Sequence, residues 1–202
     1  MSSLRPGAAF AGTALDIATL KPGAQFGRIF HARYPDPLAI GKTPSRFSGP
    51  RRRTAANRFG VLYFGSSLNV CFIESVVCDR RNGAVEDYPI EERELHDRRY
   101  AEIGIKEEML LVDLRGDGPL RMGVPSDVAG SSRQSLARLW SVAFHEHPAV
   151  PDGIIYPSRL NGETNLAVFD RSIAKLGAVL TTPLMSAAGL ARVLGDLKVA
   201  LV

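Results

Sequence analysis

The stretch FGVLYFGSSLNVCFIESVVCD, residues 59–79, places one carboxylate, Glu74, inside an almost unbroken apolar run. Its first part, residues 61–64, contains β-branched and aromatic side chains and ends at Gly65, a pattern that is typical of a strand. The two serines that follow are favoured N-cap residues, so the pattern predicts a helix over residues 68–78. The stretch therefore predicts a strand, a tight turn and a helix that carries Glu74.

The surroundings of Glu74 on this helix leave two interpretations open. Its neighbours three and four residues away are Val70, Cys71, Val77 and Cys78, and none of them is a cation that would pair with the carboxylate. In the first interpretation the glutamate lies at the rim of the helix with its head in water. In the second it is a partly desolvated carboxylate, held where a ligand arrives.

Composition sets the class of protein. A chain of 202 residues with 45% hydrophobic and 23% charged residues fits one soluble domain. The net charge of +4 suits an anionic ligand or an acidic partner, whereas basic and aromatic residues do not interleave as in many nucleic-acid binders. No apolar run is long enough for a membrane span, and Asp16 interrupts the N-terminal segment, so neither a membrane helix nor a signal peptide is expected. Cys71 and Cys78 are expected to be free, buried thiols, which suits the cytoplasm.

The remaining chain mixes strands and helices without regular βαβ alternation, which predicts an α+β fold with mixed or antiparallel sheets and flanking helices. Further strands are expected over residues 26–34, 109–114, 152–158, 165–170 and 175–184. Helices are expected over residues 126–147 and from Ser186 to the C-terminus.

The chain divides into three parts in this interpretation. Residues 1–23 form a loosely attached N-terminal arm, residues 24–185 form the main domain, and residues 186–202 form a helix packed on it. Within the domain, the strongly charged residues 79–108 are expected to form a solvated excursion, and the Pro/Gly-rich residues 35–53 form a long loop of the kind that is often functional.

Three residues outside the opening stretch are candidates for ligand binding. Arg28 lies in a predicted strand on the same face as Phe26 and Phe30, where a half-buried guanidinium suits an anion. Arg46 lies in the long loop, and Ser158 lies where a strand ends. For each of them a simpler interpretation exists: an edge-strand arginine in water, a solvated loop cation, and a hydroxyl that caps a turn.

Other motifs carry little chemistry. The histidines of HEH, residues 145–147, are two residues apart and would point to different faces of a helix, so no metal site is expected. G-x-S-x-G is absent from the sequence and Cys71 has no evident histidine partner, which disfavours nucleophilic catalysis. The basic run Arg51–Arg53 is either a solvated face or a docking site for an acidic partner.

Four motifs, in this order, resemble the RES domain family, whose name spells its Arg, Glu and Ser signature residues. The resemblance covers about residues 24–172. It rests on GRIFHAR around Arg28, SRF around Arg46, GVLYFGSSLNVCFIESV with Tyr63 and Glu74, and DGIIYPSRLNGETNLAVFDR with Ser158. One departure is visible: where the family usually has Gly-Gly-Arg-Trp-Asn, this chain has PSRFS at residues 44–48, which retains the arginine and lacks the asparagine.

The resemblance implies an ADP-ribosyltransferase-like fold and the toxin component of a bacterial toxin–antitoxin pair. Family members consume NAD by hydrolysis or phosphorolysis, or transfer ADP-ribose to a protein. The usual partner is an antitoxin with a Xre-type helix-turn-helix region, so DNA would be contacted through the antitoxin, and a homodimer within the complex is one arrangement of it.

The resemblance also implies roles for five residues. Glu74, Arg28 and Ser158 would be catalytic, and Arg28, Arg46, Tyr63 and Ser158 would hold NAD, which is the substrate; no metal is required. Glu74 would stabilise a positively charged ribose, the arginines would hold the pyrophosphate, and Tyr63 would stack on nicotinamide or ribose.

Two alternative functions remain from the sequence. A mono-ADP-ribosyltransferase would use the same residues and differ in its acceptor, which would be a protein side chain. A catalytically silent module that binds NAD or associates with DNA is the alternative from another class, and the presence of Arg28, Glu74 and Ser158 together argues against it.

Overall fold

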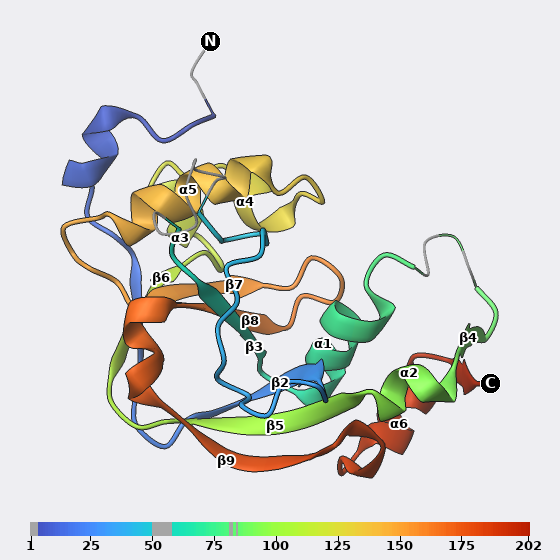
Figure 1. Ribbon diagram of the computed structural model, residues 1–202. Coiled ribbons are helices and arrows are strands. Elements are labelled where there is room, and N and C mark those ends of the chain that lie inside the picture. Colours follow the sequence, from blue (N-terminus) through green and yellow to red (C-terminus); the bar gives the residue numbers. More distant parts are fainter. Residues whose placement is uncertain (1–3, 50–57, 81–82, 84) are drawn as a thin grey trace.

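Eight strands form one mixed, curled sheet in the computed structural model, which describes residues 4–49, 58–80, 83 and 85–202 (Figure 1). The order across the sheet is β1-β6-β7-β8-β3-β2-β5-β9. The strands are β1 (Ile17–Leu20), β2 (Gln25–His31), β3 (Val61–Gly65), β5 (Arg98–Ile105), β6 (Met109–Asp113), β7 (Gly153–Pro157), β8 (Thr164–Phe169) and β9 (Leu176–Pro183). β6 and β7 pair in parallel, and the other neighbours in this sheet pair antiparallel.

Strand β3 shows how the sheet separates its two faces. Leu62 and Phe64 point to a core between the two limbs of the curled sheet, where they meet buried residues of β5, β6 and β8. Successive strand residues face opposite sides, so Val61 and Tyr63 point to the outer face. The outer face is covered by two separate groups of helices, and β3 lies where one cover ends and the other begins.

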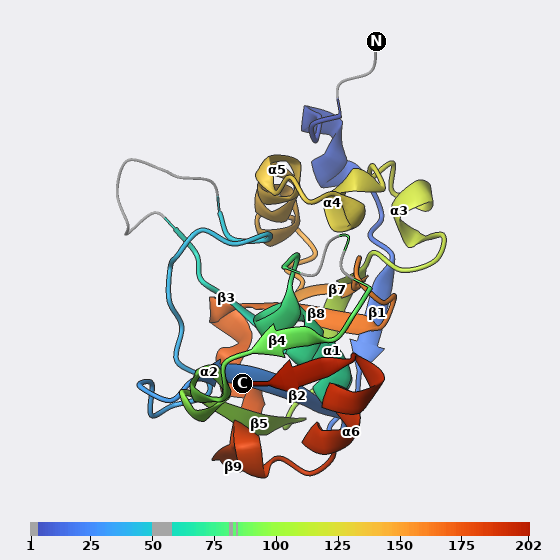
Figure 2. The same cartoon turned by 90° about the vertical axis from the view of Figure 1, so that its right-hand side faces the viewer.

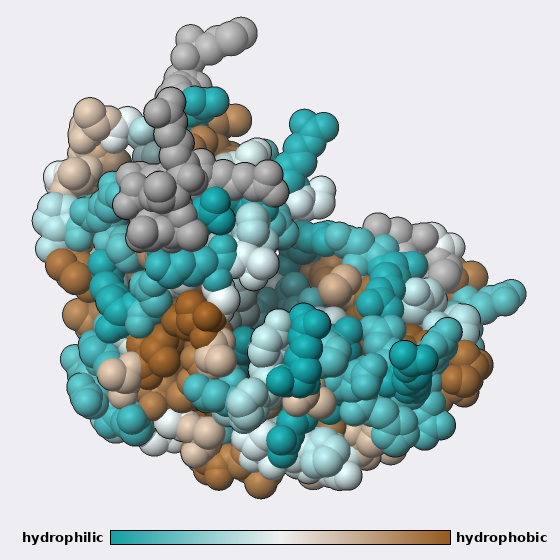
Figure 3. All heavy atoms as spheres, viewed as in Figure 1, coloured by the Kyte–Doolittle hydropathy of each residue, from teal (hydrophilic) through white to brown (hydrophobic). Residues whose placement is uncertain are grey.

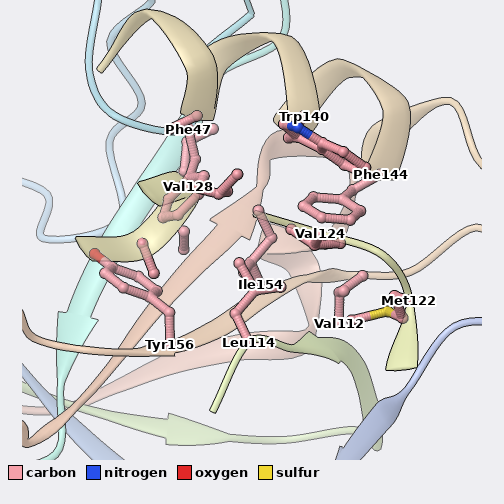
Figure 4. Close-up of a cluster of buried hydrophobic side chains, with 14 of the residues drawn as sticks. Phe47, Val112, Leu114, Met122, Val124, Val128, Trp140, Phe144, Ile154 and Tyr156 are labelled. Atoms are coloured by element: carbon pink, nitrogen blue, oxygen red, sulfur yellow. The ribbon is translucent and has the colours of Figure 1, made fainter. Parts of the chain in front are cut away.

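The first cover consists of α3 (Gly118–Arg121), α4 (Asp127–Gly130) and α5 (Ser135–His145) (Figure 1). Trp140 and Phe144 of α5 pack on β6, β7 and β8, and Phe47 enters this core from the long loop (Figure 4). The helix predicted over residues 126–147 is therefore in two pieces. The backbone is extended at Ser131, whose hydroxyl accepts a hydrogen bond from the amide of Arg133, and this local turn competes with helix continuation.

The second cover consists of α1 (Leu68–Phe72), the π-helical turn η3 (Ile73–Val77), α2 (Glu92–His96), η5 (Leu184–Ser186) and α6 (Leu190–Asp196). They share a core with Ile29 of β2. A small parallel sheet of β4 (Tyr88–Ile90) and β10 (Val199–Leu201) lies beside them (Figure 2). The Ser67 hydroxyl accepts a hydrogen bond from the Val70 amide at 3.1 Å, which confirms the predicted helix start.

Two sequence-based predictions of secondary structure are wrong. Residues 79–108 are not only a solvated excursion, because they contain β5, whose Ala101, Ile103 and Ile105 are buried. The polar residues that alternate with them concealed this strand. The C-terminal helix ends at Asp196, because Lys198 has φ of 50° and turns the chain into β10.

The N-terminal segment contacts the domain at two places. Phe10, in the 3₁₀ turn η1 (Ala8–Gly12), packs edge-on against Trp140 with ring centroids 4.9 Å apart, and β1 extends the sheet beside β6. A further 3₁₀ turn, η4 (Asp170–Lys175), connects β8 to β9. The loose attachment expected for the arm is thus not seen in η1 and β1, while the division of the chain at residues 23 and 185 stays a prediction.

Among the described residues, no helix is long and apolar enough to cross a membrane. The basic run Arg51–Arg53 lies outside the described residues.

Candidate active site

A cavity of about 430 Å³ lies between the two helical covers, where the surface is hollowed (Figure 3). Its size is within the range of small-molecule sites. Four of the five residues predicted for the site line it: Arg28, Arg46, Tyr63 and Glu74. The lining also includes Ser45, Cys71, Cys78, Asp79, Arg159 and Asn165.

Glu74 is exposed to this cavity, and its carboxylate is fixed by two neutral donors. The Ser158 hydroxyl donates to its Oε1 at 2.7 Å, and the Asn165 side-chain amide donates to the same oxygen at 3.1 Å. Within the described residues, Oε2 receives no hydrogen bond and is available to a ligand. Each of the two sequence-based interpretations agrees with the structure in part. The carboxylate lies where a ligand can enter, as in the second, but it is exposed rather than desolvated, as in the first.

The π-helical turn sets the direction of Glu74. The amide of Cys78 donates to the Ile73 carbonyl five residues back at 2.6 Å, and η3 is wider than the ordinary helix that the sequence predicts. The chain leaves this turn at Cys78 with φ of 46°, an uncommon value for a residue with a side chain. Such turns recur at functional sites.

Ser158 and Asn165 come from the ends of β7 and β8, which pair side by side. Both are buried, with 3% and 4% of their surface exposed, so water does not compete for their hydrogen bonds to Glu74. Ser158 is absent from the cavity lining, and we therefore regard it as a positioning residue rather than a ligand contact. Sequence reasoning missed Asn165, although a lone polar residue in the run TNLAVF was a signal.

Arg28 reaches the cavity from β2. Its guanidinium donates to the Pro37 carbonyl and lies 6.0 Å from the ring centroid of Phe30, as the shared face of the strand predicts. Burial lowers the pKa of Arg28 to about 10, against a smaller opposing effect of the Asp36 carboxylate. A desolvated guanidinium that uses a neutral carbonyl as its acceptor is suited to an anion.

The loop that carries Arg46 is held by hydrogen bonds rather than by a sheet. The Tyr63 hydroxyl accepts from the Phe47 amide at 2.8 Å and lies 2.9 Å from the Ser45 hydroxyl. Arg138 of α5 donates to the Ser45 carbonyl at 2.9 Å. Arg46 itself donates to the Ser131 carbonyl at 2.6 Å, at the break between α4 and α5.

The RES domain family model matches residues 25–186, about four fifths of the chain. The chain belongs to the RES domain family. The match includes every residue predicted for the site and leaves out η1 and β1.

Two relatives of this RES domain protein are informative. It is 44% identical over 107 residues to "Probable toxin y4kH" of Sinorhizobium fredii (strain NBRC 101917 / NGR234), which covers 53% of this chain and 84% of that protein. Its fold matches a chain of the crystal structure of the M. tuberculosis MbcT–MbcA toxin–antitoxin complex, with a TM-score of 0.62 and 15% identity. That match covers 89% of this chain and 91% of the other, and it confirms the predicted α+β, ADP-ribosyltransferase-like fold class.

Two cysteines of the RES domain flank Glu74 in the cavity wall. Burial raises the pKa of the Cys71 thiol to about 12, which keeps it protonated and unreactive. Cys78 is exposed, so the prediction that both thiols are buried is wrong for this residue. Its thiol donates to the Glu74 carbonyl at 2.9 Å, where it supports the turn.

The histidines predicted not to bind metal have structural contacts. The ring of His145 stacks on Phe59 with centroids 4.0 Å apart, and Nε2 of His147 lies 3.2 Å from the Thr13 carbonyl. In the part of the chain that the structure describes, no three His, Cys, Asp or Glu side chains gather as metal ligands.

Proposed function

We propose that this RES domain protein is the toxin of a toxin–antitoxin pair and that it consumes NAD by cleaving the nicotinamide–ribose bond. The observation that carries this proposal is the carboxylate of Glu74, fixed through one oxygen by Ser158 and Asn165 in a cavity that Arg28 and Arg46 also line. The relatives support the toxin assignment, because one is named a probable toxin and the other belongs to a toxin–antitoxin complex.

The chemistry needs a negative group near the ribose. When the bond breaks, its electron pair moves to the ring nitrogen of nicotinamide, and the ribose carbon develops positive charge. Oε2 of Glu74 is the free oxygen that would accept hydrogen bonds from the ribose hydroxyls and stabilise this charge. An oxygen of water or phosphate then bonds to the carbon, and with water a proton is released.

The remaining residues would bind the substrate. Arg28 and Arg46 both line the cavity with positive charge and would hold the pyrophosphate of NAD. The ring of Tyr63 lines the cavity from β3, where it would contact nicotinamide or ribose while its hydroxyl holds the loop. This mechanism uses no metal.

The test is incubation of the purified protein with NAD, with and without phosphate, followed by mass spectrometry of the products. ADP-ribose indicates hydrolysis, and its 1″-phosphate indicates phosphorolysis. A mono-ADP-ribosyltransferase would release nicotinamide and add mass to a protein instead. Intact NAD in all samples would contradict the proposal and favour a silent binding module.

We further propose that the partner is a Xre-type helix-turn-helix antitoxin and that the pair acts in the cytoplasm, with DNA contacted through the antitoxin and a homodimer within the complex. The net charge of +4 suits an inhibitor that places an acidic segment at the mouth of the cavity. Antitoxin affinity should then fall as salt rises, and charge reversal at Arg51–Arg53 should release toxicity. Unchanged neutralisation by the antitoxin would contradict this arrangement.

A further inference from the structure

An ion pair lies in the lining of the cavity, and the proposed reaction does not use it. The guanidinium of Arg159 donates to Oδ1 of Asp79, a residue 80 positions away in the chain. Both residues line the same cavity as Glu74, Arg28 and Arg46. The pair therefore places a third arginine at the site, bound to a carboxylate of the protein itself.

The backbone at Arg159 is fixed relative to Glu74. The preceding residue is Ser158, whose hydroxyl donates to Glu74 and accepts from the Leu160 amide at 3.2 Å. The same loop is attached to the start of α1, because the carboxylate of Glu163 accepts from the side-chain amide of Asn69 at 2.8 Å and from the Ser67 hydroxyl. The backbone that carries Arg159 is thus part of the structure that positions Glu74.

The two members of the pair differ in exposure. The side chain of Arg159 is 23% exposed, whereas that of Asp79 is 49% exposed. Asp79 follows directly after Cys78, where the chain leaves the π-helical turn with positive φ. Because the anion is the more solvated member, it is the one that an entering ligand would displace at lower cost.

The contact with Asp79 also leaves other hydrogen-bond donors of the guanidinium available to a ligand. It joins one nitrogen of Arg159 to one oxygen of Asp79, and within the described residues its other donors have no hydrogen-bond acceptor. The hydrogen bond from Arg159, and then the charges of Arg159 and Arg46, lower the pKa of Asp79 against the opposing effect of desolvation. Two arginines therefore favour negative charge at the place that this carboxylate occupies.

We propose that Arg159 is a third anion-binding arginine of the site and that Asp79 is its internal counter-ion, which the pyrophosphate of the substrate displaces. The identity of the substrate rests on the proposed function; the anion site itself does not. Before the substrate binds, the carboxylate would take the place of a phosphate oxygen and keep the arginine oriented.

Inorganic pyrophosphate is the probe, because its binding can be measured by calorimetry whether or not NAD is cleaved. Asp79→Asn removes the competing charge and should tighten pyrophosphate binding about two- to fivefold, in line with the modest strength of exposed ion pairs. Arg159→Gln should weaken it about tenfold, since one charge-assisted hydrogen bond is lost. In the double variant, Asp79→Asn should have no further effect.

The surface pair Arg192–Asp196 on α6 provides matched controls, because neither residue lines the cavity. Arg192→Gln and Asp196→Asn should leave pyrophosphate affinity unchanged, and thermal unfolding of all variants checks the fold. The proposal is overturned if Arg159→Gln binds pyrophosphate with wild-type affinity, or if Asp79→Asn does not bind it more tightly. It is also overturned if the wild-type protein fails to bind millimolar pyrophosphate.

NAD cleavage by the wild-type protein is measured in parallel, and it separates the two proposals. Pyrophosphate binding that depends on Arg159, without NAD cleavage, would contradict the proposed function and support the anion site. NAD cleavage together with pyrophosphate binding that does not depend on Arg159 would support the proposed function and contradict the anion site.

Discussion

The two sides of the cavity are built differently. On one side, Glu74 projects from a π-helical turn and is fixed by Ser158 and Asn165, which lie 84 and 91 residues further along the chain. On the other side, Arg46 lies in an irregular loop that Tyr63 and Arg138 hold by hydrogen bonds. The first side is thus supported by adjacent strands, and the second by a few side chains.

The difference indicates a division of labour. A carboxylate that stabilises a transition state must stay in one position, because its electrostatic effect depends on preorganisation. An arginine that binds a flexible pyrophosphate tolerates movement, and a loop that can adjust allows the ligand to enter. Variants on the Glu74 side should therefore change the rate of the reaction, and variants on the Arg46 side should change binding.

The largest effect is expected for Glu74→Gln, which keeps the size of the side chain and removes its charge. NAD cleavage should fall about 10²- to 10⁴-fold, as for other losses of a major electrostatic contribution. Turnover is measured beside that of a control, Glu92→Gln, which changes an exposed residue of α2 outside the cavity. Turnover near the wild-type rate with an unchanged melting curve would exclude Glu74 as the catalytic carboxylate.

Arg28→Ala should raise the dissociation constant for NAD about 10- to 100-fold, because a charge-assisted hydrogen bond from a desolvated guanidinium is lost. Arg46→Lys should have a smaller effect, since it retains a charge on an adjustable loop. Because the pKa of Arg28 is lowered to about 10, wild-type binding should weaken as the pH rises through that value. Arg28→Ala should not show this pH dependence of NAD binding. Equal NAD dissociation constants for the wild type and Arg28→Ala would refute the role of Arg28 in binding.

Ser158→Ala and Asn165→Ala each remove one donor to Oε1 of Glu74 and should lower kcat about tenfold with little change in KM, because the carboxylate loses its fixed orientation. Steady-state kinetics distinguishes this from substrate contact. If Ser158 contacted NAD, as the sequence-based hypothesis holds, KM would rise in Ser158→Ala and not in Asn165→Ala.

The smallest catalytic effect is expected for Tyr63→Phe, which keeps the ring and removes the acceptor of the buried Phe47 amide. The free energy of unfolding should fall by about 1–3 kcal/mol, and NAD binding should weaken a few fold as the loop loosens. Tyr63→Leu removes the ring as well. If the ring stacks on the ligand, Tyr63→Leu binds NAD much more weakly than Tyr63→Phe; equal binding would reduce Tyr63 to a support for the loop.

Sequence analysis found the residues whose types are unusual for their local pattern. Glu74 stands out in an apolar run and Arg28 in a strand between aromatic residues, and both line the cavity. The sequence pattern did not identify Asn165 or the pair of Asp79 and Arg159, because a polar residue at a strand end or in a loop is ordinary. Their importance arises from contacts between segments that are 80 or more residues apart.

The sequence by itself determined the strand–turn–helix unit at residues 61–72 and the mixture of strands and helices, because hydrophobic periodicity and capping are local properties. Tertiary structure alone decided the direction of Glu74, the break before α5 and the place of β5 inside the sheet. A π-helical turn, a buried hydrogen bond and a strand partner depend on atoms from distant segments, and a local sequence pattern does not specify which distant atoms these are.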